Sequence, residues 1–188
     1  MKKTLSTILL IISLCGYSQC PVKGDNNKTK FQHLDSLKNR VNVGKSDLKV
    51  TLEMILKTGD DTKRFTDKQY VKLTGYVILV KDGGAETCNC HSKNKVDLDV
   101  HIEIAINPDG DAKHAMIVEI NRYTKLKNQS YTVSELKKLI GKKVNVEGWL
   151  FFDEEHKQNA VNTSPNGTTL WRATCWEVHP VINITQTK

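Results

Sequence analysis

The chain has 188 residues, of which 38% are hydrophobic, and this is enough for one domain with a proper core. Its formal net charge of +7 is uneven: residues 21–69 carry 11 Lys or Arg against 7 Asp or Glu, whereas residues 70–188 carry 15 against 14. Because phosphate binding relies on clustered positive charge, the nearly neutral second region disfavours nucleic acid as a partner, although it does not exclude it.

Residues 1–19 have the pattern of a secretory signal peptide. Lys2 and Lys3 precede the apolar run LLIISL, and the small residues Gly16 and Ser18 fit a signal-peptidase site. The pattern predicts export, to the periplasm or the medium. The apolar run is too short to span a bilayer, and no later segment has the roughly 20 apolar residues that a spanning helix needs. Lipid anchoring at Cys20 is a weaker alternative, since Gln19 fits such a site poorly.

Residues 20–69 form a polar N-terminal extension with one or two short helices. Apolar residues at helical spacing between residues 31 and 41 predict a marginal helix in an otherwise flexible arm. A second helix is predicted after Ser46 or Asp47 as the N-cap, with Gly59 as its stop. Its apolar face, Leu48, Leu52, Ile55 and Leu56, is expected to pack on the following domain.

Residues 70–188 contain five strand patterns and one helix pattern. Strands are predicted over 70–81, 98–106, 115–120, 142–152 and 170–184, with a bulge or bend at Gly75. A helix capped by Thr132 or Ser134 and ended by Gly141 falls between the third and fourth strands. This order predicts a mainly β fold, a five-stranded OB-like Greek-key barrel with a helix between strands 3 and 4.

The second strand alternates apolar and ionisable residues, so one of its faces is polar. Asp99, His101 and Glu103 occupy that half-exposed face. The third strand adds Glu119. In the last strand Trp176, Val178, Ile182 and Ile184 take the core phase, which leaves Glu177 and His179 on the polar side. Because the third strand of an OB barrel lies between the second and the fifth, His101 and His179 are expected to approach each other across it. Three further candidates come from nearby loops: Asp153, His156 and Asn166.

These residues are compatible with three kinds of site. The leading hypothesis is an exported OB-fold binding protein whose ligand contacts the polar face of strands 2, 3 and 5, with the ligand class left open among glycan, peptide, nucleic acid and metal. The alternative is a metal-dependent hydrolase or nuclease, with His101, His156, His179 and Glu177 as catalytic candidates. A divalent metal would then be held by His101, His179 and Glu119. The third hypothesis is a structural network of mutually satisfied polar groups.

Four cysteines follow the predicted signal peptide. In an oxidising compartment Cys175 is expected to form a disulfide with Cys88 or Cys90. The CNCH segment also permits a metal site that includes His91, although C-x-C is tighter than the usual zinc spacing and no second Cys/His pair is near.

Several short motifs together resemble a group of small exported bacterial proteins of unknown function. The chain has the D-x-H, M-I-V-E, P-N-G and W-E-x-H-P-V signatures of that group in order, and the match covers residues 73–184. Before P-N-G, its segment GWLFFDEEH (residues 148–156) resembles the group's G-x-F-F-D-x-x-H signature, with one more residue after the glycine. The chain departs from the group by the insertions CNCHSKNK and TLWRATCW. The resemblance implies a shared barrel and a shared site, and it implies no activity. The implied site residues are Asp99, His101, Glu119, His156, Glu177 and His179.

Overall fold

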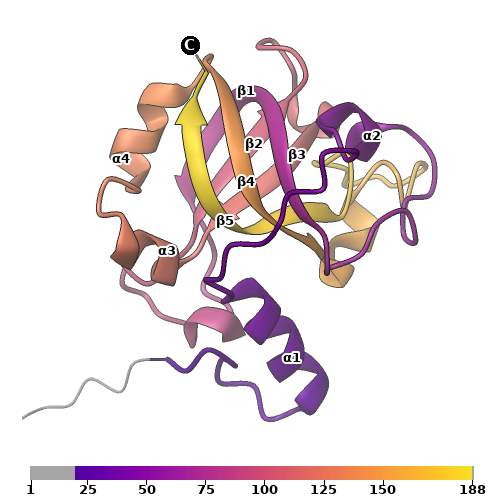
Figure 1. Ribbon diagram of the computed structural model, residues 1–188. Helices are drawn as coiled ribbons and strands as arrows, with labels where there is room; N and C mark the ends of the chain where they lie inside the picture. The colour runs from indigo at the N-terminus through magenta and orange to yellow at the C-terminus, as the bar shows by residue number, and fades with distance from the viewer. Residues whose placement is uncertain (1–19, 188) are drawn as a thin grey trace, which may run out of the picture.

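The computed structural model describes residues 20–187, so the predicted signal peptide lies outside the described residues. Five strands close into a barrel in the order β1-β2-β3-β5-β4 (Figure 1). All neighbouring strands are antiparallel except β3 and β5, which are parallel. This is the predicted OB-like architecture. The strands are β1 (Tyr70–Asp82), β2 (Val100–Ala105), β3 (Ala115–Ile120), β4 (Lys143–Phe152) and β5 (Trp176–Gln186).

The helix between β3 and β4 is confirmed. Thr132 caps α4 (Val133–Leu136) by accepting a hydrogen bond from the backbone N–H of Glu135, and the helix continues as the 3-10 turn η3 (Lys137–Leu139). Gly141 follows with φ of +77°. The sequence patterns missed a further short helix, α3 (Arg122–Lys127), which Asn121 caps in the same way. The remaining 3-10 turns are η1 (Thr87–Asn89), η2 (Ala112–His114) and η4 (Glu154–Asn159).

The first strand, β1, pairs with a different neighbouring strand along each half of its length. Residues 70–76 pair with β4 and residues 76–82 pair with β2. The irregularity in register falls between Val77 and Leu79 rather than at Gly75. Gly75 has a different role: a Cβ there would lie 2.7 Å from the Leu52 side chain. The absence of a side chain therefore lets α2 (Leu52–Leu56) approach the strand.

Alternate residues of β2 and β3 fill the core as predicted, among them Ile102 and Met116, which are fully buried. The core positions predicted for β5 are confirmed at Trp176, Val178 and Ile184, and the prediction is wrong only at Ile182. Val181 occupies the core, whereas Ile182 is half-buried. The reason is that the pairing of β4 with β5 shifts on both sides of Gly148: one shift brings Val181 to the core face, and the other returns Ile184 to it.

The N-terminal extension is an ordered part of the molecule, and the prediction of a flexible arm was wrong. Helix α1 (Thr29–Lys38) lies beside η1 at one end of the barrel (Figure 1). The side-chain amide of Asn39 donates to the backbone oxygens of Val22 and Cys88. The amide of Asn121 donates to the backbone oxygen of Lys38. The second helix begins only after Thr51, so Leu48 stays exposed.

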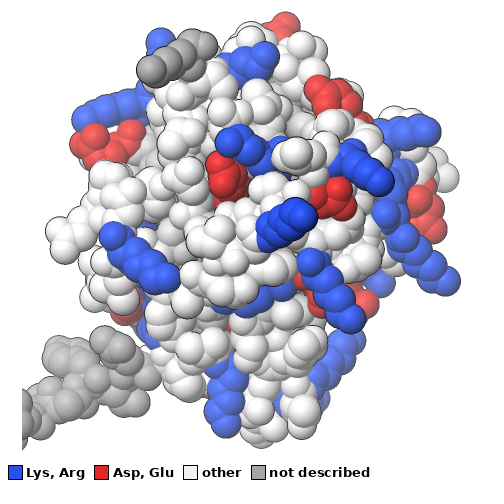
Figure 2. Space-filling model, in the orientation of Figure 1, with Lys and Arg blue, Asp and Glu red and all other residues white. Residues whose placement is uncertain are grey.

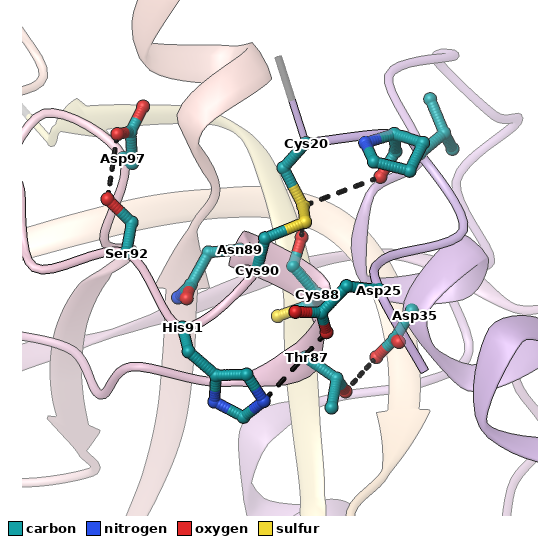
Figure 3. Close-up of a disulfide and its surroundings, with 12 residues drawn as sticks. Cys20, Asp25, Asp35, Thr87, Cys88, Asn89, Cys90, His91, Ser92 and Asp97 are labelled. Carbon is teal, nitrogen blue, oxygen red and sulfur yellow. Dashed lines mark hydrogen bonds and ion pairs between the residues drawn. A yellow bond between two sulfur atoms is a disulfide. The ribbon is translucent and has the colours of Figure 1, made fainter. Parts of the chain in front are cut away.

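The disulfide joins Cys20 to Cys90, with an S–S distance of 1.97 Å (Figure 3). The predicted bridge to Cys175 was therefore wrong: Cys88 and Cys175 are buried free thiols. The arm brings Cys20 to the loop, where Arg122 and Tyr123 both donate to its backbone oxygen. A sulfur in this bridge is available neither for a lipid thioether nor as a metal ligand, so Cys90 cannot serve the metal site that the CNCH segment permitted as an alternative. A stable disulfide is typical of an oxidising compartment.

The surface shows mixed charge. Lys and Arg are spread over the face in Figure 2, with Asp and Glu among them. Within residues 20–187, none of the helices has the length and apolar character needed to cross a membrane.

We predict that replacing both Cys20 and Cys90 by Ser lowers the free energy of unfolding by about 2–5 kcal/mol, because the bridge constrains the unfolded chain. Urea unfolding of the two proteins measures the difference. Reductant should destabilise the parent protein and leave the double variant unchanged. A non-reduced digest that yields a peptide bridged through Cys175 would contradict the assignment.

Candidate functional site

The polar face of β2, β3 and β5 is buried, not half-exposed as the alternation in β2 suggested. Asp99, His101 and Glu103 are only 6–7% exposed, and His179 is fully buried. Segments distant in sequence surround the face: α1, the loop after β1, and the segment before β5. Buried charged groups require partners, so their contacts determine what the site can do.

His101 is held between two carboxylates. It lies directly opposite Glu119 in the β2–β3 pairing. Its Nδ1 donates to Glu119 Oε1 at 2.8 Å, and its Nε2 lies 3.4 Å from Glu103 Oε1. Burial alone would lower the pKa of His101, but the hydrogen bonds to Glu103 and Glu119 outweigh it and raise the pKa to about 9. His101 is therefore an imidazolium at neutral pH.

His179 is surrounded by three carboxylates. Its Nε2 lies 3.0 Å from Asp99 Oδ2, and its Nδ1 lies 3.2 Å from Glu119 Oε2 and 3.5 Å from Glu177 Oε2. Burial opposes the charged form, but the carboxylates outweigh it and raise the pKa of His179 to about 10. Glu119 contacts both imidazoles, one with each oxygen. The structure thus brings His101 and His179 together across β3, as the strand order predicted.

Arg172 is the principal site residue that the sequence patterns missed. Its side chain is 1% exposed, and its Nη1 and Nη2 donate to Asp153 and Glu177, each at 2.8 Å. Its Nε donates to the backbone oxygen of Thr174. Arg172 therefore links the end of β4 to β5. The available signal was a single charged residue inside the otherwise uncharged segment TLWRATCW.

His156 and Asp153 form a second imidazole–carboxylate pair. His156 Nδ1 donates to Asp153 Oδ2 at 2.5 Å. This hydrogen bond raises the pKa of His156. Burial would raise the pKa of Asp153, but His156 and Arg172 together hold it well below its usual range. The side chain of His156 is 41% exposed, and its ring lies edge-on to Trp171, with 5.2 Å between centroids.

His101, His156, His179 and Arg172, with the carboxylates that they contact, form one cluster of charged side chains. A pocket of about 360 Å³ opens above this cluster. Lys38 from α1 lies on its wall and pairs with Glu86 at 2.5 Å. Burial would lower the pKa of Lys38, but Glu86 outweighs this effect and raises it. Of the predicted site residues, five line the pocket: His101, Glu119, Asp153, His156 and Glu177.

The other predicted residues do not line this pocket. Asp99, Glu103 and His179 are buried within the cluster, whereas Asn166 is exposed on its loop and belongs to neither. A larger and more apolar pocket of about 640 Å³ is lined by residues of α3 and α4, and none of the predicted site residues reaches it. The chemistry of the chain is therefore concentrated in the smaller, polar pocket.

Comparisons with models of known protein families and with curated proteins find no match for this chain. The resemblance to small exported proteins, and the site it implies, stay predictions. The function of the chain therefore has to be inferred from the geometry of its own residues.

We predict that Arg172→Met lowers the free energy of unfolding by roughly 3–5 kcal/mol, because it leaves Asp153 and Glu177 buried without their cation. Urea unfolding measures this cost. The matched control is Lys72→Met, which removes a partly exposed ion pair with Glu147 and should cost less than about 1 kcal/mol. Equal effects of the two substitutions would contradict a structural role for the buried pair.

Proposed function

We propose that this protein is an exported OB-fold binding protein that holds a small polar ligand in the pocket above β2, β3 and β5. The observation that carries the proposal is the pocket itself, where charged side chains of both signs converge from segments that are distant in the sequence: Lys38, Lys81, Glu86, His101, Arg172 and Glu177. Binding sites are typically concave and contain a few convergent polar groups of this kind.

The size and lining of the pocket favour a compact ligand with many polar groups. A volume of about 360 Å³ lies at the lower end of the range for small-molecule sites. Lys38 and His101 supply donors, Glu86 and Glu177 supply acceptors, and Trp171 adds an aromatic surface. This balance suits a hydroxyl-rich or zwitterionic molecule such as a monosaccharide or an amino acid. It suits a polyanion less well, because the acidic groups would repel phosphates.

Two observations support an extracytoplasmic location. The bridge between Cys20 and Cys90 is of a kind that persists in oxidising compartments. The sequence of residues 1–19 has the composition of a secretory signal. We therefore place the encounter with the ligand in the periplasm or the medium.

The test is a ligand-detected NMR screen of monosaccharides, amino acids and nucleotides. We expect binding of a member of the first two classes, weakened at least about tenfold by Gly84→Phe. Gly84 lines the pocket, and a Cβ at this position would have only the Glu86 side chain within 4 Å, so a larger side chain there obstructs the pocket without breaking the buried network.

Asn166→Phe is the matched control, since Asn166 is exposed outside the pocket, and it should bind as the parent does. Equal binding by Gly84→Phe, or no binding of any class, would overturn the proposal and favour the structural network.

The pair of His156 and Asp153 favours one second candidate, a hydrolase that acts on a pocket-bound substrate. The carboxylate fixes Nδ1 and Arg172 in turn fixes the carboxylate, while His156 lies on the pocket wall. An imidazole oriented in this way can move a proton between water and substrate. In this hypothesis His156 is the acid/base and Asp153 a positioning residue.

For this pair we predict that Asp153→Asn lowers the pKa of His156, because it removes the hydrogen bond that raises it. An NMR titration of the histidine side chains measures the shift. Asp111→Asn, which removes the partner of the exposed His114, should leave His156 unchanged. If a hydrolysed substrate is found, the alkaline limb of its rate profile should move with the same pKa. An unchanged pKa in Asp153→Asn would eliminate the dyad.

A further inference from the structure

We propose that Asp99, Glu119 and His179 form a binding site for a divalent transition-metal ion, within the cluster and next to the pocket. The three side chains come from the segment before β2, from β3 and from β5. Each offers one ligand atom, and these atoms all lie within 4.8 Å of one another. The site goes beyond the ligand binding proposed above and does not depend on it.

The first argument is charge. The cluster and its rim contain seven carboxylates and three permanently charged cations, Lys38, Lys81 and Arg172. The other positive charges that can balance these carboxylates are those of His101, His156 and His179. Carboxylates removed from water are stable only with a cation close by, and a metal ion supplies two charges at one point. The seven carboxylates are those of Asp82, Glu86, Asp99, Glu103, Glu119, Asp153 and Glu177.

The second argument is independent of the carboxylates. His179 is fully buried, and neither of its ring nitrogens makes a hydrogen bond of acceptable geometry, although carboxylate oxygens lie 3.0–3.5 Å away. Buried side-chain nitrogens nearly always have a partner. A metal ion on one ring nitrogen would complete the coordination of this imidazole among the oxygens that already surround it.

The donor set points to the kind of metal. One imidazole with carboxylate oxygens suits Zn²⁺ or Mn²⁺, whereas Ca²⁺ and Mg²⁺ favour oxygen ligands alone. Zinc bonds to these donors are about 2.0–2.2 Å long, so the ligand atoms need to close in slightly around the ion. Glu119 also lines the pocket, which gives the ion a route of entry.

His101 has a supporting role in this site. Its Nδ1 is already bonded to one oxygen of Glu119, so His101 orients that carboxylate and leaves the second oxygen directed at His179. Metal ligands commonly have such a partner behind them. His101 is thus a positioning residue here, whereas the sequence had suggested it as a ligand.

The experiment uses the oxidised protein, stripped of metal and dialysed against Zn²⁺ in the presence of excess Mg²⁺. We expect one tightly held Zn²⁺ per chain by elemental analysis. Asp99→Asn and Glu119→Gln, which keep the shape of each side chain, should weaken Zn²⁺ binding at least about tenfold. His114→Gln is the matched control, because it removes an exposed imidazole beside Asp111, and it should bind as the parent does.

Circular dichroism establishes whether each variant is folded. Where a variant does not fold, X-ray absorption of the zinc-loaded parent protein decides: one imidazole with oxygen ligands supports the site, and a sulfur or a second imidazole in the shell overturns it. Retained binding in folded Asp99→Asn and Glu119→Gln would also overturn it, as would binding weaker than a Kd of about 1 mM in the parent protein.

Discussion

The carboxylate of Glu119 contacts both buried imidazoles, His101 and His179, and the polar cluster depends on these contacts. It lies in the middle strand of the polar face, directly opposite His101 and beside His179 on the parallel strand. Burial by itself raises the pKa of Glu119, and the two imidazoles oppose that effect. Each of these three groups is tolerable away from water only because the others are present. The strand order of the barrel is what brings them within reach.

α1, the loop after β1 and the segment before β5 cover the polar face of β2, β3 and β5 and keep water away from it. Interactions between charges strengthen as water is excluded, so the arm and the loops increase the coupling among the groups beneath them. Lys38 reaches the pocket only because α1 is fixed at the end of the barrel, by Asn39 and by the bridge at Cys20. The N-terminal extension is therefore part of the site, although it contributes no strand to the barrel.

The sequence was informative where a local pattern decides the structure. The alternation in β2, the cap at Thr132 and the stop at Gly141 predict the barrel and its helix correctly, because each depends on near neighbours. The phase of β5 after His179 depends on the register with Gly148 on another strand, and the burial of His101 depends on distant covering segments. The pairing of Cys20 with Cys90 spans 70 residues, so spacing does not reveal it.

Arg172 shows why the site was harder to predict than the fold. An isolated arginine in an apolar segment has no periodic pattern, and its importance lies in two carboxylates that the barrel places beside it. Glu177 uses one oxygen for Arg172 and turns the other toward His179, so the guanidinium also sets the charge that the imidazole meets. The half-buried His156 and the fully buried His179 are thus connected through Asp153, Arg172 and Glu177. A change at the rim of the pocket can reach its buried end through these contacts.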